Sequence, residues 1–175
     1  MNSKFKEINP DHFNENVIRL IGKEWMLITA GNSQDVNTMT AAWGGLGFLW
    51  NLPVAFIFVR PQRHTFNFTE KYSSFSLSFF DREYRDILNF CGKYSGRDFD
   101  KIKETGLTAF ESIDGNVLFE QAKINIECTK VYADDIQESK FILPAIDHKI
   151  YPQKDYHRFY IGKIDHLWID KKISI

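Results

Sequence analysis

A strict alternation of apolar and hydroxyl side chains marks residues 74–79 of this 175-residue chain. Phe75, Leu77 and Phe79 alternate there with three serines. Because successive side chains of a strand point to opposite faces, this period of two predicts a β-strand with one face in an aromatic core. The chain must therefore build a sheet around this segment.

Other segments also have the pattern of strands. Residues 25–30 and 53–59 are short apolar runs typical of buried strands, and residues 124–129 alternate in the same way as 74–79. Val131 breaks that alternation, so we expect a β-bulge there. The remaining predicted strands are 37–42, 107–111, 117–119 and 156–169.

Helical periodicity is confined to short segments between these strands. Its clearest instance is 83–93, where Tyr84, Ile87 and Cys91 share one apolar face. Further helices are predicted at 9–22, 65–71 and 99–105. Many strands with a few helices between them predict one domain, covering residues 1–175, that is a β-barrel with helical insertions.

Two stretches are expected to lack regular structure. Three glycines follow Trp43 within four residues, which indicates a loop that needs unusual backbone angles or close approach. Residues 134–155 are polar and carry two prolines, so we interpret them as a long surface excursion.

Charge and cysteine content exclude several classes of function. The formal net charge is −1 and no basic block is present, so nucleic-acid binding is not expected. Cys91 and Cys128 are far apart and are predicted to be free buried thiols, and the histidines show no metal-ligand spacing, so no metal is expected. The N-terminus lacks the apolar run of a signal peptide and no apolar run is long enough to span a membrane. We therefore expect a soluble, cytoplasmic protein.

The segment from 37 to 65 carries the candidate chemistry. Small side chains and glycines at 38–47 would let a flat ligand lie against bare backbone, although a plain barrel strand has the same composition. Arg60, Arg63, His64 and Thr65 follow at the junction of a strand and a helix, where arginines and helix N–H groups suit a phosphate. The alternative is a basic surface turn. Together these features indicate a cradle for a planar ring with a phosphate tail.

These motifs resemble the flavin reductase-like family, also called the FMN-binding split barrel. The resemblance covers about 25–168 and rests on five pieces of sequence, at 25–31, 37–44, 60–65, 95–98 and 156–162. It implies a mainly β split barrel of Greek-key type that forms a homodimer and binds FMN near the subunit interface. It also implies that NAD(P)H supplies a hydride.

The resemblance also assigns roles to residues. Ser95 and Arg97 would reach the cofactor region, unless Asp98 caps the next helix and Arg97 makes a surface pair. Trp43 would shield the flavin, or would be a core tryptophan. The residues expected to bind the cofactor are Thr38, Met39, Thr40, Ala41, Ala42, Trp43, Arg60, Arg63, His64, Thr65, Ser95 and Arg97.

His157 is the catalytic candidate, on the nicotinamide side of the flavin. Some family members have a glycine before the aspartate-histidine pair at this point, whereas here the local sequence is Asp155-Tyr156-His157. We expect an NAD(P)H-dependent FMN reductase that passes electrons to an acceptor the sequence does not identify. The altered segment favours one alternative, a flavoredoxin-like electron carrier, and a non-catalytic ligand-binding barrel is the other.

Overall fold

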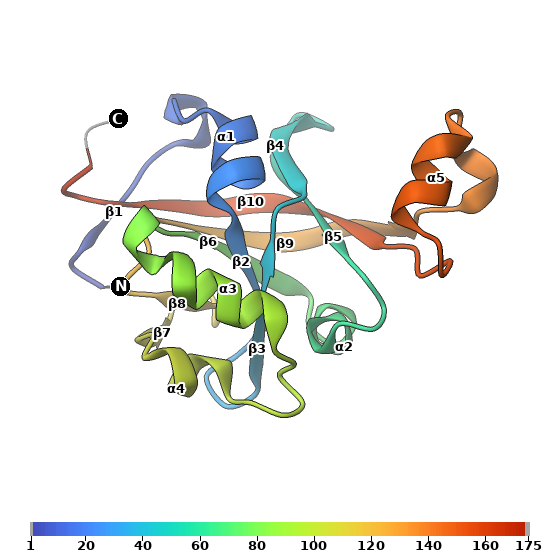
Figure 1. Ribbon diagram of the computed structural model, residues 1–175. Helices are drawn as coiled ribbons and strands as arrows, with labels where there is room; N and C mark the ends of the chain where they lie inside the picture. The colour runs from blue at the N-terminus through green and yellow to red at the C-terminus, as the bar shows by residue number, and fades with distance from the viewer. Residues whose placement is uncertain (1, 174–175) are drawn as a thin grey trace.

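A computed structural model describes residues 2–173 (Figure 1). Its main sheet has eight strands, all paired antiparallel, in the order β3-β2-β6-β9-β10-β5-β4, with β1 also paired to β10. The strands are β1 (Phe5–Glu7), β2 (Met26–Gly31), β3 (Val36–Ala41), β4 (Gly44–Leu49), β5 (Leu52–Val59), β6 (Ser74–Phe79), β9 (Ile124–Asp135) and β10 (Arg158–Asp170). A separate hairpin consists of β7 (Ala109–Glu111) and β8 (Val117–Phe119).

The two outer strands of the sheet path are joined by a very short connection. β3 ends at Ala41 and β4 begins at Gly44, so only Ala42 and Trp43 link them. This link requires the sheet to curl until its two edges approach each other. The mainly β split-barrel prediction is confirmed, and Trp43 lies at the split.

β6 lies inside the sheet, as its alternation predicted. Phe75, Leu77 and Phe79 are fully buried in the main core. Ser76 and Ser78 on the serine face are buried as well. Ser76 donates to the Val117 carbonyl and Ser78 to Asn125 Oδ1, each at 2.6 Å. Buried hydroxyls need such partners, and the β7–β8 hairpin supplies one of them.

β9 and β10 form the longest ribbon of the molecule (Figure 1). Their register shifts beside Gly162, which pairs with Lys130 while its neighbour pairs with Tyr132, so Val131 is the extra residue of the predicted bulge. A Cβ on Gly162 would lie 2.6 Å from the Phe75 ring and 2.7 Å from Cys128. Only glycine fits at this crossing of the core.

The helices cover different parts of the sheet (Figure 1). α3 (Arg85–Lys93) and α4 (Lys101–Thr105) pack beside β3, and α2 (His64–Lys71) follows β5. α5 (Pro144–Ile150) lies at the far end of the β9–β10 ribbon, away from α3 and α4. Shorter turns are α1 (Val17–Arg19), η1 (Pro10–His12), η2 (Leu20–Glu24), η3 (Arg82–Tyr84) and η4 (Glu138–Lys140).

Three local predictions are wrong. The expected helix over 9–22 is divided into short turns, since the Asn9 and Asn16 side chains each accept a backbone N–H and begin a new turn. The expected glycine loop after Trp43 is the strand β4, which pairs with β5 along its whole length. The excursion at 134–155 is shorter than expected, because β9 continues to Asp135, and it contains α5.

The two cysteines are free and buried, as predicted. Within residues 2–173, no helix is long and apolar enough to cross a membrane. Over the same range, no three His, Cys, Asp or Glu side chains are grouped so that they could hold a metal ion.

Candidate functional site

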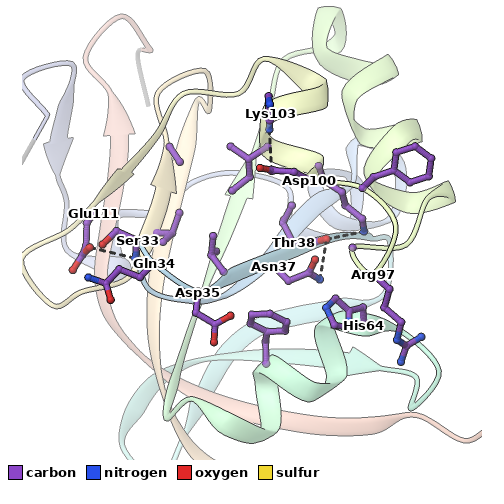
Figure 2. A pocket seen from close by; sticks show the side chains of 18 of the residues that line it. Ser33, Gln34, Asp35, Asn37, Thr38, His64, Arg97, Asp100, Lys103 and Glu111 are labelled. Atoms are coloured by element: carbon purple, nitrogen blue, oxygen red, sulfur yellow. Dashed lines mark hydrogen bonds between the residues drawn. The ribbon is translucent and has the colours of Figure 1, made fainter.

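Two cavities border β3, one after the other along the strand. The first, which we call the aromatic cavity, has a volume of about 270 Å³ and is lined by Met39, Thr40, Ala41, Ala42, Trp43, Phe58, Arg60, Arg63 and His157. The second, the polar cavity, has a volume of about 740 Å³ (Figure 2). Its lining includes Asn37, Thr38 and His64 and the charged residues Asp35, Arg97, Asp98, Asp100, Lys101, Lys103 and Glu111. Sequence neighbours divide between the two cavities: Thr38 and His64 line the polar cavity, and Met39 and Arg63 line the aromatic cavity.

Trp43 and His157 form the aromatic end of the first cavity. The Trp43 side chain is 47% exposed, so it is not a core residue, and its ring centroid lies 5.0 Å from that of His157. The strand-to-strand link places Trp43 there, while β10 begins directly after His157. The split between β3 and β4 is therefore covered by two flat side chains.

His157 is a buried, neutral imidazole. It is 7% exposed, and its Nδ1 lies 2.8 Å from the Tyr151 hydroxyl. Burial, and then the nearby charge of Arg60, lower the pKa of His157 to about 4. At neutral pH this side chain can offer hydrogen bonds to a ligand without adding charge.

The charge of Arg60 is already neutralised. Its guanidinium forms an ion pair with Asp155, donates to the Ile150 carbonyl at 3.0 Å and lies over the Tyr151 ring. Gln62 donates to the same carboxylate at 2.6 Å. Arg60 therefore fastens the end of α5 to the aromatic cavity.

Arg63 lies at the boundary of the two cavities and holds the end of a helix. It donates to the Gly92 carbonyl at 2.8 Å and to the Cys91 carbonyl at 3.4 Å, both in the last turn of α3. Such carbonyls lack partners within the helix and carry partial negative charge. Burial lowers the pKa of Arg63.

Lys101 is the residue that the sequence did not reveal. It is only 4% exposed, and its Nζ donates to the Thr38 and Cys91 carbonyls, each at 2.9 Å. Burial, and then the charge of Arg63, lower its pKa to about 8. A lysine in the first turn of a polar helix normally points to solvent, so only the fold shows that this one points inward.

Asn37, Thr38, His64 and Arg97 meet at the polar cavity from three different segments (Figure 2). In the described part of the chain, Nδ1 of His64 is buried without a hydrogen-bond partner. Burial, and then the charges of Arg97 and Lys101, lower its pKa. An unpartnered buried nitrogen beside cations is typical of a place where a ligand completes the hydrogen bonding.

Gly96 brings the turn at 95–98 against this group. A Cβ at Gly96 would lie 1.8 Å from Asn37 Oδ1 and 3.1 Å from His64 Cδ2. No side chain fits there, so glycine is required for the turn to close the polar cavity. The alternative of a helix cap at Asp98 is wrong, because Asp100 supplies the cap: its side chain accepts from the Lys103 N–H at 3.1 Å.

A family model described as "Flavin reductase like domain" matches residues 18–174. The chain belongs to the flavin reductase-like family. The resemblance carried by the sequence motifs is thus confirmed over nearly the whole chain. No curated protein matches the chain significantly.

Solved structures share this family fold at low sequence identity. The FMN-binding protein from Thermus thermophilus has a TM-score of 0.66 and 20% identity, over 93% of this chain and 77% of that one. Flavoredoxin from Methanosarcina acetivorans has a TM-score of 0.67 and 19% identity, over 97% and 77%. An NADH:FAD oxidoreductase of Streptomyces globisporus has a TM-score of 0.63 and 14% identity, over 82% and 74%.

In this flavin reductase-like chain, the residues expected from sequence to bind cofactor divide into three groups. Seven line the aromatic cavity, from 39 to 43 together with Arg60 and Arg63, and His157 joins them. The polar cavity takes Thr38, His64 and Arg97. Thr65 and Ser95 line neither cavity.

Both of these hydroxyls have partners within the fold. Thr65 is buried, with its Oγ1 accepting from Asn37 Nδ2 at 2.6 Å, and Ser95 Oγ accepts from the Arg97 N–H at 3.2 Å. Their contribution to the site is to hold Asn37 and the turn at 95–98 in place.

Proposed function

We propose that this protein binds FMN and acts as an NAD(P)H-dependent oxidoreductase, with the flavin ring in the aromatic cavity and the phosphate at the polar cavity. Family membership and FMN-binding structural neighbours support the cofactor. The observation that carries the proposal is the pairing of the two cavities along β3. One is walled by flat and small groups, and the other contains two cations, Arg97 and Lys101, that no carboxylate among the described residues pairs with.

The chain offers the flavin ring a strip of unpaired backbone. β3 is an edge strand, paired only with β2, so the N–H and C=O groups of its other edge have no strand partner, although Lys101 donates to the Thr38 carbonyl. The Thr40 hydroxyl is turned away, since it donates to the Leu88 carbonyl at 2.5 Å, and Ala41 and Ala42 have the smallest side chains that bear a Cβ. A heterocycle could therefore reach the backbone of residues 39–43 without displacing bulky groups.

The chemistry that bound FMN supplies is acceptance of a hydride from NAD(P)H and onward transfer of electrons. The chain's residues would orient the ring and exclude water from it. Trp43 and His157 do this at one end, and because His157 is neutral at pH 7 it adds no charge to the reacting region. Positioning of this kind needs no catalytic acid or base.

The phosphate fits where cations lack carboxylate partners. Among the described residues, no carboxylate lies within ion-pair distance of Arg63, Arg97 or Lys101, whereas Arg60 is paired with Asp155. Lys101 uses two of its three N–H donors, so one is left for a ligand. Among the described residues, His64 Nδ1 has no hydrogen-bond partner. A phosphate dianion at this point would accept charged hydrogen bonds from these cations and would also give the His64 Nδ1 atom a hydrogen-bond partner.

The first test is the visible absorption spectrum of purified protein after FMN is added and excess is removed. We expect a retained flavin spectrum, followed by bleaching under anaerobic stopped-flow mixing with NADH or NADPH. If titration with FMN does not perturb the spectrum at all, the proposed cofactor is wrong.

A flavoredoxin-like electron carrier is the second candidate. The tyrosine between Asp155 and His157 favours it, and so do the structural neighbours named flavoredoxin, from Methanosarcina acetivorans and from Desulfovibrio vulgaris. Retained flavin that NADH and NADPH fail to bleach, but that a one-electron reductant does bleach, would favour the carrier over the reductase.

A homodimer is part of the proposal. Phe48 and Trp50, at the end of β4, are 68% and 55% exposed, and Trp50 lies beside Tyr132 of β9 with ring centroids 6.2 Å apart. Exposed aromatic groups of this kind are typical of protein interfaces. Light scattering should give twice the chain mass, and a monomer that retains FMN fully would remove the dimer from the proposal.

A further inference from the structure

Tyr151 contacts His157, which lines the aromatic cavity, from the stretch 134–155 that the sequence presents as a surface excursion. It follows directly after α5, at the end of the β9–β10 ribbon (Figure 1). Its side chain is nevertheless only 3% exposed, and its hydroxyl lies 2.8 Å from Nδ1 of His157. The two rings meet edge to face, with centroids 5.6 Å apart.

Either Tyr151 or His157 could donate the proton in this hydrogen bond, and the choice depends on which buried group would be left without a partner. In the described residues, the Tyr151 hydroxyl has no partner other than His157. If it accepted a proton from Nδ1, its own O–H would be buried without an acceptor, which is costly. If it donates, only acceptor capacity is left unused. Donation by Tyr151 is therefore favoured, and a neutral His157 then carries its proton on Nε2.

The orientation of the His157 ring places Nε2 on the side opposite Tyr151. His157 lines the aromatic cavity, and Nε2 makes no hydrogen bond to any of residues 2–173. We infer that Tyr151 is a positioning residue, which fixes His157 in the Nε2–H form and so presents a neutral N–H donor to the ring bound in the aromatic cavity. The consequence for flavin rests on the proposed function, whereas the Tyr151–His157 bond does not.

Tyr151 is itself held on two sides. The Arg60 guanidinium lies 5.3 Å from its ring centroid and donates to the carbonyl of the preceding residue, Ile150, at 3.0 Å. Tyr156 packs on the ring with centroids 4.8 Å apart. Arg60 and its partner Asp155 are also the charged groups that face His157. The rotation of Tyr151 is therefore restricted, so its hydroxyl stays aimed at Nδ1.

The experiment is a long-range ¹H–¹⁵N spectrum of histidine-labelled protein without flavin. We expect His157 to show a protonated Nε2 and an unprotonated Nδ1 at pH 7. Tyr151→Phe should shift the Nδ1 resonance and let the Nδ1–H form appear. Tyr156→Phe is the matched control: its hydroxyl donates to Asp147 at 2.6 Å, so its loss should leave the His157 nitrogens unchanged.

A wild-type protein with its proton on Nδ1 would overturn the inference, and this result needs no variant to fold. Nitrogen resonances that are identical in Tyr151→Phe and wild type would also overturn it.

A second readout uses FMN. Tyr151→Phe should weaken FMN binding roughly threefold to tenfold, as expected for one weakened hydrogen bond, and should shift the flavin absorption maximum, while Tyr156→Phe does neither. If neither the wild type nor the variants bind flavin but the tautomer changes as described, the proposed function fails and the Tyr151–His157 inference stands. If flavin binds and the tautomer is insensitive to Tyr151, the inference fails alone.

Discussion

The aromatic and polar cavities border the same strand but differ in how their cations are used. Around the aromatic cavity, Arg60 is neutralised by Asp155 and His157 carries no charge at neutral pH. Around the polar cavity, Lys101 and Arg97 have only carbonyl partners. Arg63, at the boundary, likewise holds carbonyls. Two arginines near one strand end thus differ in their charge balance, and under the proposed function the cations without a carboxylate partner are the ones that would hold the phosphate.

The largest expected effect concerns the neutral histidine of the aromatic cavity. The folded pKa of His157, about 4, lies below its ordinary value of 6.5, so between these pH values the unfolded chain binds a proton that the folded protein rejects. Stability is therefore fully present above pH 6.5 and falls as the pH drops toward 4, by roughly 2–3 kcal/mol from this group.

Urea unfolding at pH 7.5, 5.5 and 4.0 measures this loss. Between pH 7.5 and 4.0, the unfolding free energy of wild type should fall by more than that of His157→Gln. The difference between the two proteins should equal the loss assigned to His157. Identical pH profiles for the two proteins would mean that His157 is not desolvated as described, and the contrast between the cavities would weaken.

The second prediction concerns Lys101, the buried cation of the polar cavity. Lys101→Met should weaken FMN binding by about 2 kcal/mol, because a charged hydrogen bond to phosphate is lost, and should leave riboflavin binding nearly unchanged. Flavin fluorescence titration measures both. Lys93→Met is the control: this lysine is exposed, lies over Tyr94 and lines neither cavity. Equal losses for FMN and riboflavin would place the phosphate elsewhere.

The third prediction separates the two arginines. Arg63→Met should weaken FMN binding by about 1 kcal/mol, since its charge is not neutralised, whereas Arg60→Met should change it less. Arg60→Met should instead loosen the α5 segment, which hydrogen exchange at residues 144–155 would detect. A larger loss of FMN affinity in Arg60→Met than in Arg63→Met would reverse the assignment of the cations.

The smallest effect is expected at the aromatic wall. Trp43→Leu should weaken FMN and riboflavin binding equally, by about 0.5–1 kcal/mol, because only ring contacts are lost. The same fluorescence titration applies. An effect on FMN alone would contradict the placement of the flavin ring beside Trp43.

Local patterns in the sequence predicted much of the fold. The alternation at 74–79, the helix at 85–93 and the bulge at Val131 all follow from side-chain periods that neighbouring residues set. The glycines after Trp43 predict a loop, but they form a strand because they pair with β5. A Cβ at Gly45 would lie 3.6 Å from the Phe56 ring, which covers this strand. Long-range contacts of that kind leave little mark on local composition.

The candidate site was predictable to a similar extent. The family resemblance pointed to residues 39–43, whereas their composition alone also fits a plain barrel strand, and the structure places them around one cavity. Lys101 and Tyr151 could not be found, since each is an ordinary residue of a polar segment until the fold buries it. Nor could the sequence show that Asp155 neutralises Arg60, 95 residues away.

The most direct test of a ring in the aromatic cavity and a phosphate at the polar cavity is amide chemical-shift mapping with two ligands. Riboflavin and FMN should both perturb the amides of residues 39–43, while FMN alone should perturb Gly96 and Lys101. If riboflavin perturbs both groups equally, or if neither ligand perturbs residues 39–43, the proposed division of the site between the two cavities is wrong.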